Sequence, residues 1–149
     1  MDKKTMIVSA FIVAILAIGA SLLVMERETE PATRISELDE EEITNEMTIY
    51  WFKSEMCPYC HDQEPYLDEW EKLDAVEVKK HEISEGENQE LLQKMLKGYG
   101  APSGGVPATF IGGDYWIGFG ESIRRDMEEK LVNCLTAEVS CPGPMERIE

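Results

Sequence analysis

Two cysteines separated by two residues form the motif in this sequence with the clearest chemical potential. The motif C-P-Y-C runs from Cys57 to Cys60 and follows Thr48–Phe52, a β-branched and aromatic segment typical of a buried strand. Apolar residues then recur at helical spacing, which places the motif at a strand-to-helix junction. Three positions of separation put both sulfurs on one helical face, close enough to bond. The spacing therefore predicts a redox-active dithiol.

The two cysteines are expected to have different roles. Cys57 should lie at a helix N-terminus, where free backbone N–H groups and the helix dipole stabilise a thiolate, so its pKa is predicted to fall below ~8.5. Cys60 lies one turn further along the helix and should be more sheltered. We therefore expect Cys57 to attack a partner disulfide as the nucleophile, and Cys60 to resolve the mixed disulfide that results.

The other two cysteines, Cys134 and Cys141, bear on two further hypotheses. Zinc sites also use C-x-x-C, but a structural zinc needs a second close pair of ligands, and this pair flanks a predicted helix end at an unsuitable spacing. His61 is expected on another side of its helix, so no metal site is predicted. Cys134 and Cys141 are expected to close a short structural loop; the alternative is a relay pair that passes electrons to Cys57 and Cys60.

The predicted order of elements is strand, helix, strand, helix, strand, strand, helix. After the motif's helix, these elements are a strand at Ala75–Ile83, a helix with Asn88 as its N-cap that ends at Gly98, a hairpin of Val106–Ile111 and Tyr115–Phe119, and a helix from Ile123 to Leu135. The first two strands should be parallel through a right-handed crossover, and the hairpin antiparallel. The class is α/β.

Several segments resemble the thioredoxin superfamily, and the glutaredoxins in particular. K-S-E-M-C-P-Y-C, beginning at Lys53, is similar to the glutaredoxin active-site segment, including the lysine four residues before the first cysteine. Pro65 stands where thioredoxin-like proteins have the proline that kinks the active-site helix. G-V-P-A-T-F, beginning at Gly105, is similar to the superfamily's cis-proline loop and the strand after it.

The resemblance extends from about Thr48 to Leu135 and implies a thioredoxin-like fold, a four-stranded mixed sheet with flanking helices. It also implies a cis peptide bond before Pro107, which should lie against the cysteine pair, with Pro58 and Tyr59 supporting the site. A cis X–Pro bond costs little compared with other cis peptides. It would expose the backbone of Val106, which can pair with an extended substrate as a short added strand.

By this resemblance the chain is expected to be a thiol–disulfide oxidoreductase acting on protein dithiols, without a cofactor, and recycled by a membrane-bound or soluble redox partner. Lys53 matches the residue that glutaredoxins direct at a glutathione carboxylate, whereas Gly118–Ser122 matches their second glutathione-binding segment only in part. A glutathione-dependent glutaredoxin therefore stays an alternative. A second is a non-catalytic binding or metal-carrier module. Oxidase, reductase and isomerase directions stay open.

Residues 6–25 are almost entirely apolar, and as a helix they would extend roughly 30 Å, the thickness of a bilayer's hydrocarbon core. Lys3 and Lys4 precede this segment, so the positive-inside rule keeps residues 1–5 in the cytoplasm and exports everything after it. A cleaved signal peptide is the alternative. Because the apolar run continues through Leu22–Met25, past the plausible cleavage site, we favour an uncleaved signal-anchor.

Charge and composition complete the expected organisation. The net charge of −16 disfavours a nucleic-acid partner, because phosphate backbones are repelled. Residues 26–46 are rich in acids and predict an extended linker. The folded domain is expected at residues 47–136 and an irregular tail at 137–149. The prediction is thus a single-pass protein of the cell membrane whose catalytic domain lies outside the cytoplasm, where disulfides persist.

Overall fold

The computed structural model describes residues 35 and 38–148. The predicted cytoplasmic segment 1–5, the membrane anchor 6–25 and the first part of the acidic linker lie outside the described residues. Within the described part of the chain, no helix combines the length and the apolar character needed to cross a membrane.

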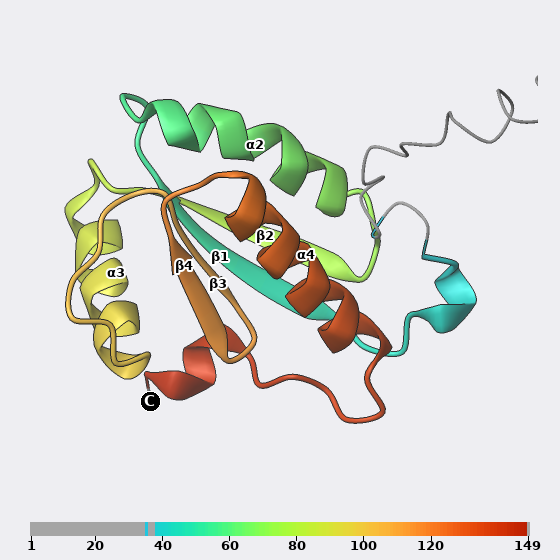
Figure 1. Cartoon of the computed structure of the whole chain (residues 1–149). Helices are drawn as coiled ribbons and strands as arrows, with labels where there is room; N and C mark the ends of the chain where they lie inside the picture. The colour runs from blue at the N-terminus through green and yellow to red at the C-terminus, as the bar shows by residue number, and fades with distance from the viewer. Residues whose placement is uncertain (1–34, 36–37, 149) are drawn as a thin grey trace, which may run out of the picture. The chain divides into compact units, whose positions relative to one another are not determined.

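A four-stranded mixed sheet forms the centre of the described chain (Figure 1). Its strands, in spatial order, are β2 (Val76–Glu82), β1 (Met47–Lys53), β3 (Ala108–Ile111) and β4 (Asp114–Ile117). β1 pairs in parallel with β2 and antiparallel with β3, and β3 pairs antiparallel with β4. β1 is central and buried on both faces, which accounts for its nearly continuous apolar sequence.

Three helices cover the two faces of this sheet. α2 (Pro58–Trp70) and α4 (Glu121–Thr136) lie on one face, and α3 (Gly86–Gly98) lies on the other (Figure 1). A parallel β1–α2–β2 unit followed by a helix, an antiparallel hairpin and a last helix is the connectivity of the thioredoxin-like fold. The sheet and flanking helices predicted from the sequence are therefore confirmed.

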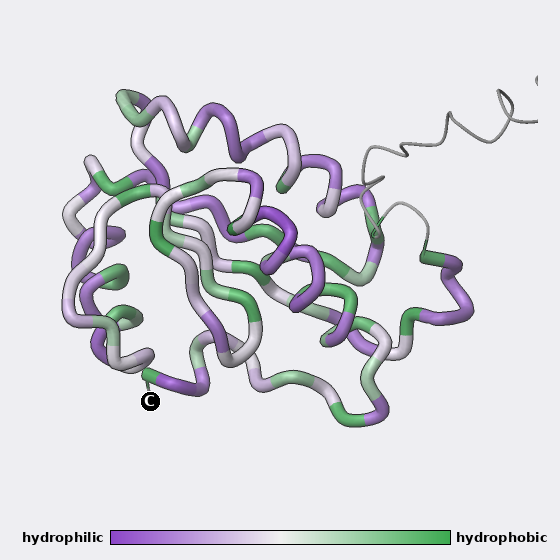
Figure 2. Tube along the Cα trace, viewed as in Figure 1, coloured by the Kyte–Doolittle hydropathy of each residue, from purple (hydrophilic) through white to green (hydrophobic). Residues whose placement is uncertain are grey.

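Side chains of β1 alternate between two cores, one on each face of the sheet. Ile49 and Trp51 pack with α2 and α4, whereas Tyr50 and Phe52 pack with α3. Figure 2 shows hydrophobic residues along the central strands and long hydrophilic stretches on the helices, as expected for helices with one face in solvent. The two cores together fix β1, and with it the segment that continues into α2.

The start of α3 differs from the prediction. The helix begins at Gly86 with Glu85 as its N-cap, so Asn88 is not the cap. The Asn88 side chain is engaged elsewhere: its Nδ2 donates to the Glu82 carbonyl at 3.0 Å, and its Oδ1 lies 3.0 Å from His81 Nδ1. These bonds tie the helix to the end of β2, and a capping role would have broken them.

The hairpin strands are shorter than predicted. β3 begins at Ala108, because Pro107 has no N–H to contribute to a ladder. β4 ends at Ile117, because Gly118 has a φ of 88°, outside the strand region. The tail predicted to be irregular contains a short 3₁₀ helix, η3 (Pro144–Arg147), which packs near α3 (Figure 1).

Packing begins before Met47. Ile35 is buried in the core shared with α2 and α4, and a 3₁₀ turn, η2, covers Glu40–Glu42. The backbone N–H groups of Thr44 and Asn45 both donate to the Leu135 carbonyl, at 2.9 and 3.1 Å. The residues just before β1 are therefore fastened to the end of α4.

Candidate active site

Cys57 and Cys60 lie at the junction between β1 and α2. Cys57 is the N-cap of α2, with extended backbone angles, and Pro58 occupies the first helical position, which suits its fixed φ and missing N–H. Cys57 is partly exposed, whereas Cys60 is only 2% exposed. The two residues form a disulfide with their Cα atoms 5.2 Å apart. The junction thus presents one sulfur at the surface with a buried sulfur bonded to it.

Backbone donors converge on Cys57. The Cys60 N–H lies 3.2 Å from Cys57 Sγ and 3.0 Å from the Cys57 carbonyl, and the His61 N–H lies 3.3 Å from that carbonyl. The His61 ring donates through Nε2 to the Glu55 carbonyl at 2.9 Å, and so holds the loop that precedes Cys57. In the reduced protein, an N–H aimed at Sγ and the positive end of the helix dipole favour a thiolate on Cys57.

The loop before β3 has the expected proline geometry. The Val106–Pro107 peptide bond is cis, as the resemblance implied. Pro107 is buried and its carbonyl accepts a hydrogen bond from the Gly118 N–H at 2.7 Å, while Val106 is partly exposed. Since β3 runs antiparallel to β1, the amino end of β3 lies beside the carboxyl end of β1, where α2 begins. Pro107 and the cysteine pair are thus at the same end of the sheet.

A buried polar network, which the sequence reasoning missed, lies under the cysteine pair. Gln63, one turn after Cys60 on the inner face of α2, is 0% exposed. Its Oε1 accepts a hydrogen bond from the Trp51 indole at 3.0 Å, and its Nε2 donates to Thr109 Oγ1 at 2.8 Å and approaches Met127 Sδ at 3.6 Å. The available signal was a single amide within the otherwise apolar inner stripe of α2.

Lys53, the predicted glutathione contact, is already paired. Its Nζ lies 2.7 Å from Glu64 Oε1 and 5.1 Å from the centre of the Trp51 ring. Glu82 lies beside Lys53 in the β1–β2 register and adds a second carboxylate on that side. An incoming carboxylate would have to displace Glu64, which weakens the case for glutathione at this position.

The second predicted glutathione segment leads into another ion-pair cluster. Arg124 of α4 is bound by Glu121 at 2.5 Å and by Glu128 at 2.7 Å, and its guanidinium lies 5.3 Å from the Tyr66 ring. Tyr66 in turn contacts Phe119, with ring centres 5.6 Å apart. The hydrogen bond from Arg124 lowers the pKa of Glu121, whereas burial raises the pKa of Glu128. The Arg124 guanidinium is therefore already bound by two carboxylates of this chain.

The surface around Cys57 is apolar and open. Met56 is 90% exposed and Tyr59 is 60% exposed, immediately before and two residues after the cysteine. Pro58, between them, is also exposed. Singly exposed apolar residues are ordinary, but three of them beside one partly exposed sulfur give a partner an apolar surface to contact there.

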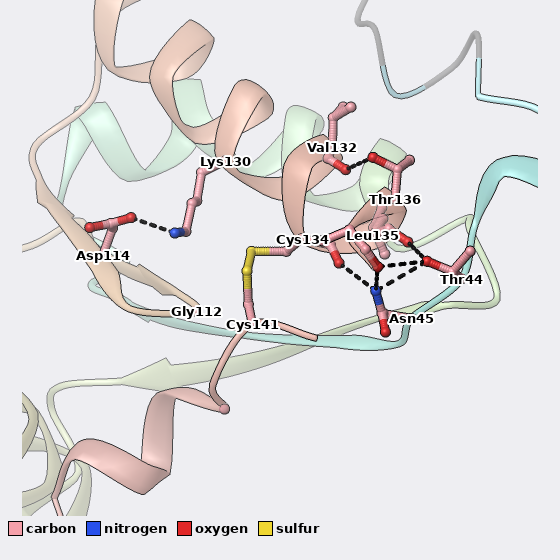
Figure 3. The surroundings of a disulfide bond; sticks show 12 residues. Thr44, Asn45, Gly112, Asp114, Lys130, Val132, Cys134, Leu135, Thr136 and Cys141 are labelled. Atoms are coloured by element: carbon pink, nitrogen blue, oxygen red, sulfur yellow. Dashed lines mark hydrogen bonds and ion pairs between the residues drawn. A yellow bond between two sulfur atoms is a disulfide. The ribbon is translucent and has the colours of Figure 1, made fainter. Parts of the chain in front are cut away.

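Cys134 and Cys141 form a second disulfide, which links the last turns of α4 to the tail (Figure 3). Cys134 is fully buried, and its carbonyl accepts a hydrogen bond from Asn45 Nδ2 at 3.1 Å. Asn45 precedes the amino end of β1, whereas Cys57 follows the carboxyl end, and the seven residues of β1 span about 20 Å. Sulfur exchange needs direct contact, so this pair cannot act as a relay in the observed conformation.

The second disulfide also rests on the β3–β4 turn. Gly112 has a φ of 57°, and a Cβ added there would lie 3.1 Å from Cys141 Cβ and 3.3 Å from Cys134 Sγ. Beyond Cys141 the tail reaches Tyr99, whose hydroxyl donates to the Gly112 carbonyl at 2.6 Å and to the Pro144 carbonyl at 3.4 Å. All four cysteines of the chain are in these two disulfides.

No family model matches the chain, and no curated protein matches it. A mutant thioredoxin from Halobacterium salinarum NRC-1 is 24% identical, over 70% of this chain and 87% of that chain, with a TM-score of 0.45. StoA from Bacillus subtilis is 18% identical, over 59% of this chain and 84% of that chain, with a TM-score of 0.36. At these levels the fold assignment rests on the strand order and connectivity described above.

Proposed function

We propose that the protein is a thiol–disulfide oxidoreductase that exchanges disulfides with protein dithiols through Cys57 and Cys60. The observation behind this proposal is the asymmetry of the pair. Cys57 is partly exposed at the N-cap of α2, with a backbone N–H 3.2 Å from its sulfur, and Cys60 is buried behind it. A thiolate at a helix N-terminus is both populated and accessible, which are the two requirements for a nucleophilic cysteine.

The reaction has two balanced steps. With the pair reduced, the Cys57 thiolate attacks one sulfur of a partner disulfide, and the partner's other sulfur leaves as a thiolate with the electron pair. Cys60 then loses its proton and attacks Cys57 Sγ, and the partner's first sulfur leaves. The partner gains two electrons and the Cys57–Cys60 disulfide forms. Run in reverse, the same steps oxidise a partner dithiol.

Two features support protein substrates over glutathione. Lys53, the cation compared with the glutathione contact of glutaredoxins, is paired with Glu64 of this chain, and the second segment, Gly118–Ser122, matches theirs only in part. The open, apolar surroundings of Cys57 and the partly exposed Val106 next to the cis-proline suit an extended segment of a protein partner, which Val106 could hold by backbone pairing.

Trapping of the intermediate tests the proposal. Cys60→Ser removes the intramolecular resolving thiol, so mixed disulfides through Cys57 should accumulate, because release then depends on external thiols and slows by orders of magnitude. Non-reducing gels should show adducts that collapse on reduction and that are absent in the matched control Cys57→Ser. If Cys60→Ser forms no adducts while the wild-type protein reduces insulin, the two-cysteine mechanism is wrong and a single-thiol route replaces it.

We further propose that residues 6–25 anchor the protein in the cell membrane and that the redox domain faces out of the cytoplasm. The support is the apolar run behind Lys3 and Lys4. Protease added to intact spheroplasts should then digest the domain. Protection of the domain under conditions that cleave a known external protein would reverse the orientation.

A further inference from the structure

The buried amide of Gln63 takes no part in either exchange step, yet its position is unusual. The inner face of α2 otherwise buries Cys60, Leu67 and Trp70. A buried carboxamide is costly unless its hydrogen-bonding groups are satisfied, and a leucine of similar size would avoid that cost. At Gln63 every group has a partner, and those partners come from three different elements: Trp51 of β1, and the residues of β3 and α4 described above.

These bonds fasten the turn of α2 that contains Cys60 to the two strands beneath it. Trp51 and Thr109 are direct neighbours in the β1–β3 register, and one carboxamide spans both. Cys60 belongs to the same buried core as Trp51. A substitution at Gln63 is therefore expected to shift the helical turn that contains Cys60, and with it the Cys60 sulfur.

The Gln63 carboxamide also carries no charge, unlike the paired side chains on the neighbouring elements. β1 contributes the Lys53 cation, which is paired with Glu64 of α2, and α4 contributes Arg124, which is paired with Glu128. β3, with the sequence A-T-F-I, contributes no charged side chain. Lys53 and Arg124 are thus each held by carboxylates of the described chain, with Arg124 between Glu121 and Glu128, whereas the Gln63 carboxamide is neutral.

The resolving step makes that neutrality important. Cys60 must lose its proton before its thiolate attacks Cys57 Sγ, and a negative charge one helical turn away would oppose that ionisation. We propose that Gln63 is a positioning residue of the redox centre: it seats the Cys60 turn on β1 and β3, and it keeps the space under Cys60 uncharged so that the resolving thiolate can form. This inference rests on the proposed function.

A neutral aromatic disulfide, 4,4′-dithiodipyridine, separates the two steps in the full-length reduced protein. Attack by Cys57 releases a first equivalent of the chromophoric thiol, and attack by Cys60 on the resulting mixed disulfide releases a second. Stopped-flow absorbance over about pH 5 to 9 gives both rates. The variants are Gln63→Glu and Gln63→Leu, and the matched control is Gln93→Glu, at an exposed glutamine of α3.

Gln63→Glu should slow the second phase about tenfold near neutral pH and add an inflection to its pH profile, because a like charge within one turn raises a thiol pKa by a unit or more. Gln63→Leu should keep the wild-type shape of the pH profile but slow the second phase severalfold, because the Cys60 turn loses its fastening. Gln93→Glu should behave as wild type. A role in stability alone would leave the pH profile of Gln63→Glu unchanged.

A Gln63→Glu profile that superimposes on that of the wild type overturns the inference. Should Gln63→Leu fail to fold, Thr109→Val removes one of the same hydrogen bonds with little change of shape, and an unchanged second phase in that variant also refutes the positioning role. A wild-type protein that releases only one equivalent contradicts the proposed function itself. A wild-type protein that releases two, with Gln63→Glu indistinguishable from it, contradicts only the assignment of Gln63.

Discussion

Removing the second disulfide should destabilise the protein without reducing its redox activity. Cys134 and Cys141 are seven positions apart and lie at the amino end of β1, whereas Cys57 lies beyond its carboxyl end. In the double variant Cys134→Ala, Cys141→Ala, the tail loses its covalent link to α4 and the Gly112 turn loses the sulfur packed against it. The exchange centre is untouched.

The expected magnitude follows from the length of the closed loop. Opening a loop of this length costs about 2.4 kcal/mol in the chain-entropy account. Truncating the fully buried Cys134 adds about 1 kcal/mol for lost packing. With an m-value of roughly 1.5 kcal/mol per M, a total of about 3 kcal/mol lowers the urea midpoint by about 2 M. Cys141→Ala alone opens the loop but leaves Cys134 in the core, so it should show most of the effect.

Urea unfolding and an insulin-reduction assay on the same preparations test this prediction. The expected outcome is a lower midpoint with wild-type turnover below the unfolding transition. The opposite pattern, in which stability is retained and turnover is lost, would show that Cys134 and Cys141 transfer electrons, and the structural interpretation would have to be abandoned.

Three further predictions follow from the charges and the buried polar groups. With a net charge of −16, the protein should gain stability as NaCl rises from roughly 0.05 M to about 1 M, because screening weakens self-repulsion; urea midpoints that do not change with salt would contradict this. Burial raises the pKa of Tyr99 to about 12, above its unfolded value near 10. The contribution of the neutral Tyr99 hydroxyl to the free energy of unfolding should therefore be fully present below about pH 10 and should be lost as the pH rises toward 12. Tyr99→Phe should remove that alkaline loss, as measured by urea unfolding across this range. Arg124→Met should cost about 3–5 kcal/mol near neutral pH, because it leaves Glu128 buried without its partner; adding Glu128→Gln should recover part of the loss, and no recovery would argue against the pair.

The sequence predicted the parts of this fold that depend on local pattern. The run of β-branched and aromatic residues before Cys57 predicted a buried strand, and the apolar residues at helical spacing after Cys60 predicted a helix, so the redox junction followed from periodicity. With Cys57 and Cys60 assigned to one pair, the even cysteine count left Cys134 and Cys141 as the other. Each of these inferences uses neighbours in sequence.

Long-range contacts explain what the sequence did not predict. Asn88 has the chemistry of an N-cap, but β2 lies within reach of its side chain and takes its hydrogen bonds. Gln63 looks like a surface residue until Trp51 and Thr109 are brought beneath α2 by the folding of the sheet. The tail's short helix lies against Tyr99, whose hydroxyl donates to the Pro144 carbonyl and whose ring lies 5.2 Å from the Arg147 guanidinium.

The most direct test of the account compares the alkylation rates of the two active-site cysteines. In the reduced protein, limited iodoacetamide labelling at several pH values, mapped by mass spectrometry, should modify Cys57 at least about tenfold faster than Cys60 near neutral pH, because Cys57 is accessible and at the helix start whereas Cys60 is buried. The difference should disappear in urea, where both thiols are exposed. Equal labelling in the folded protein, or faster labelling of Cys60, would contradict the assignment of Cys57 as the nucleophile.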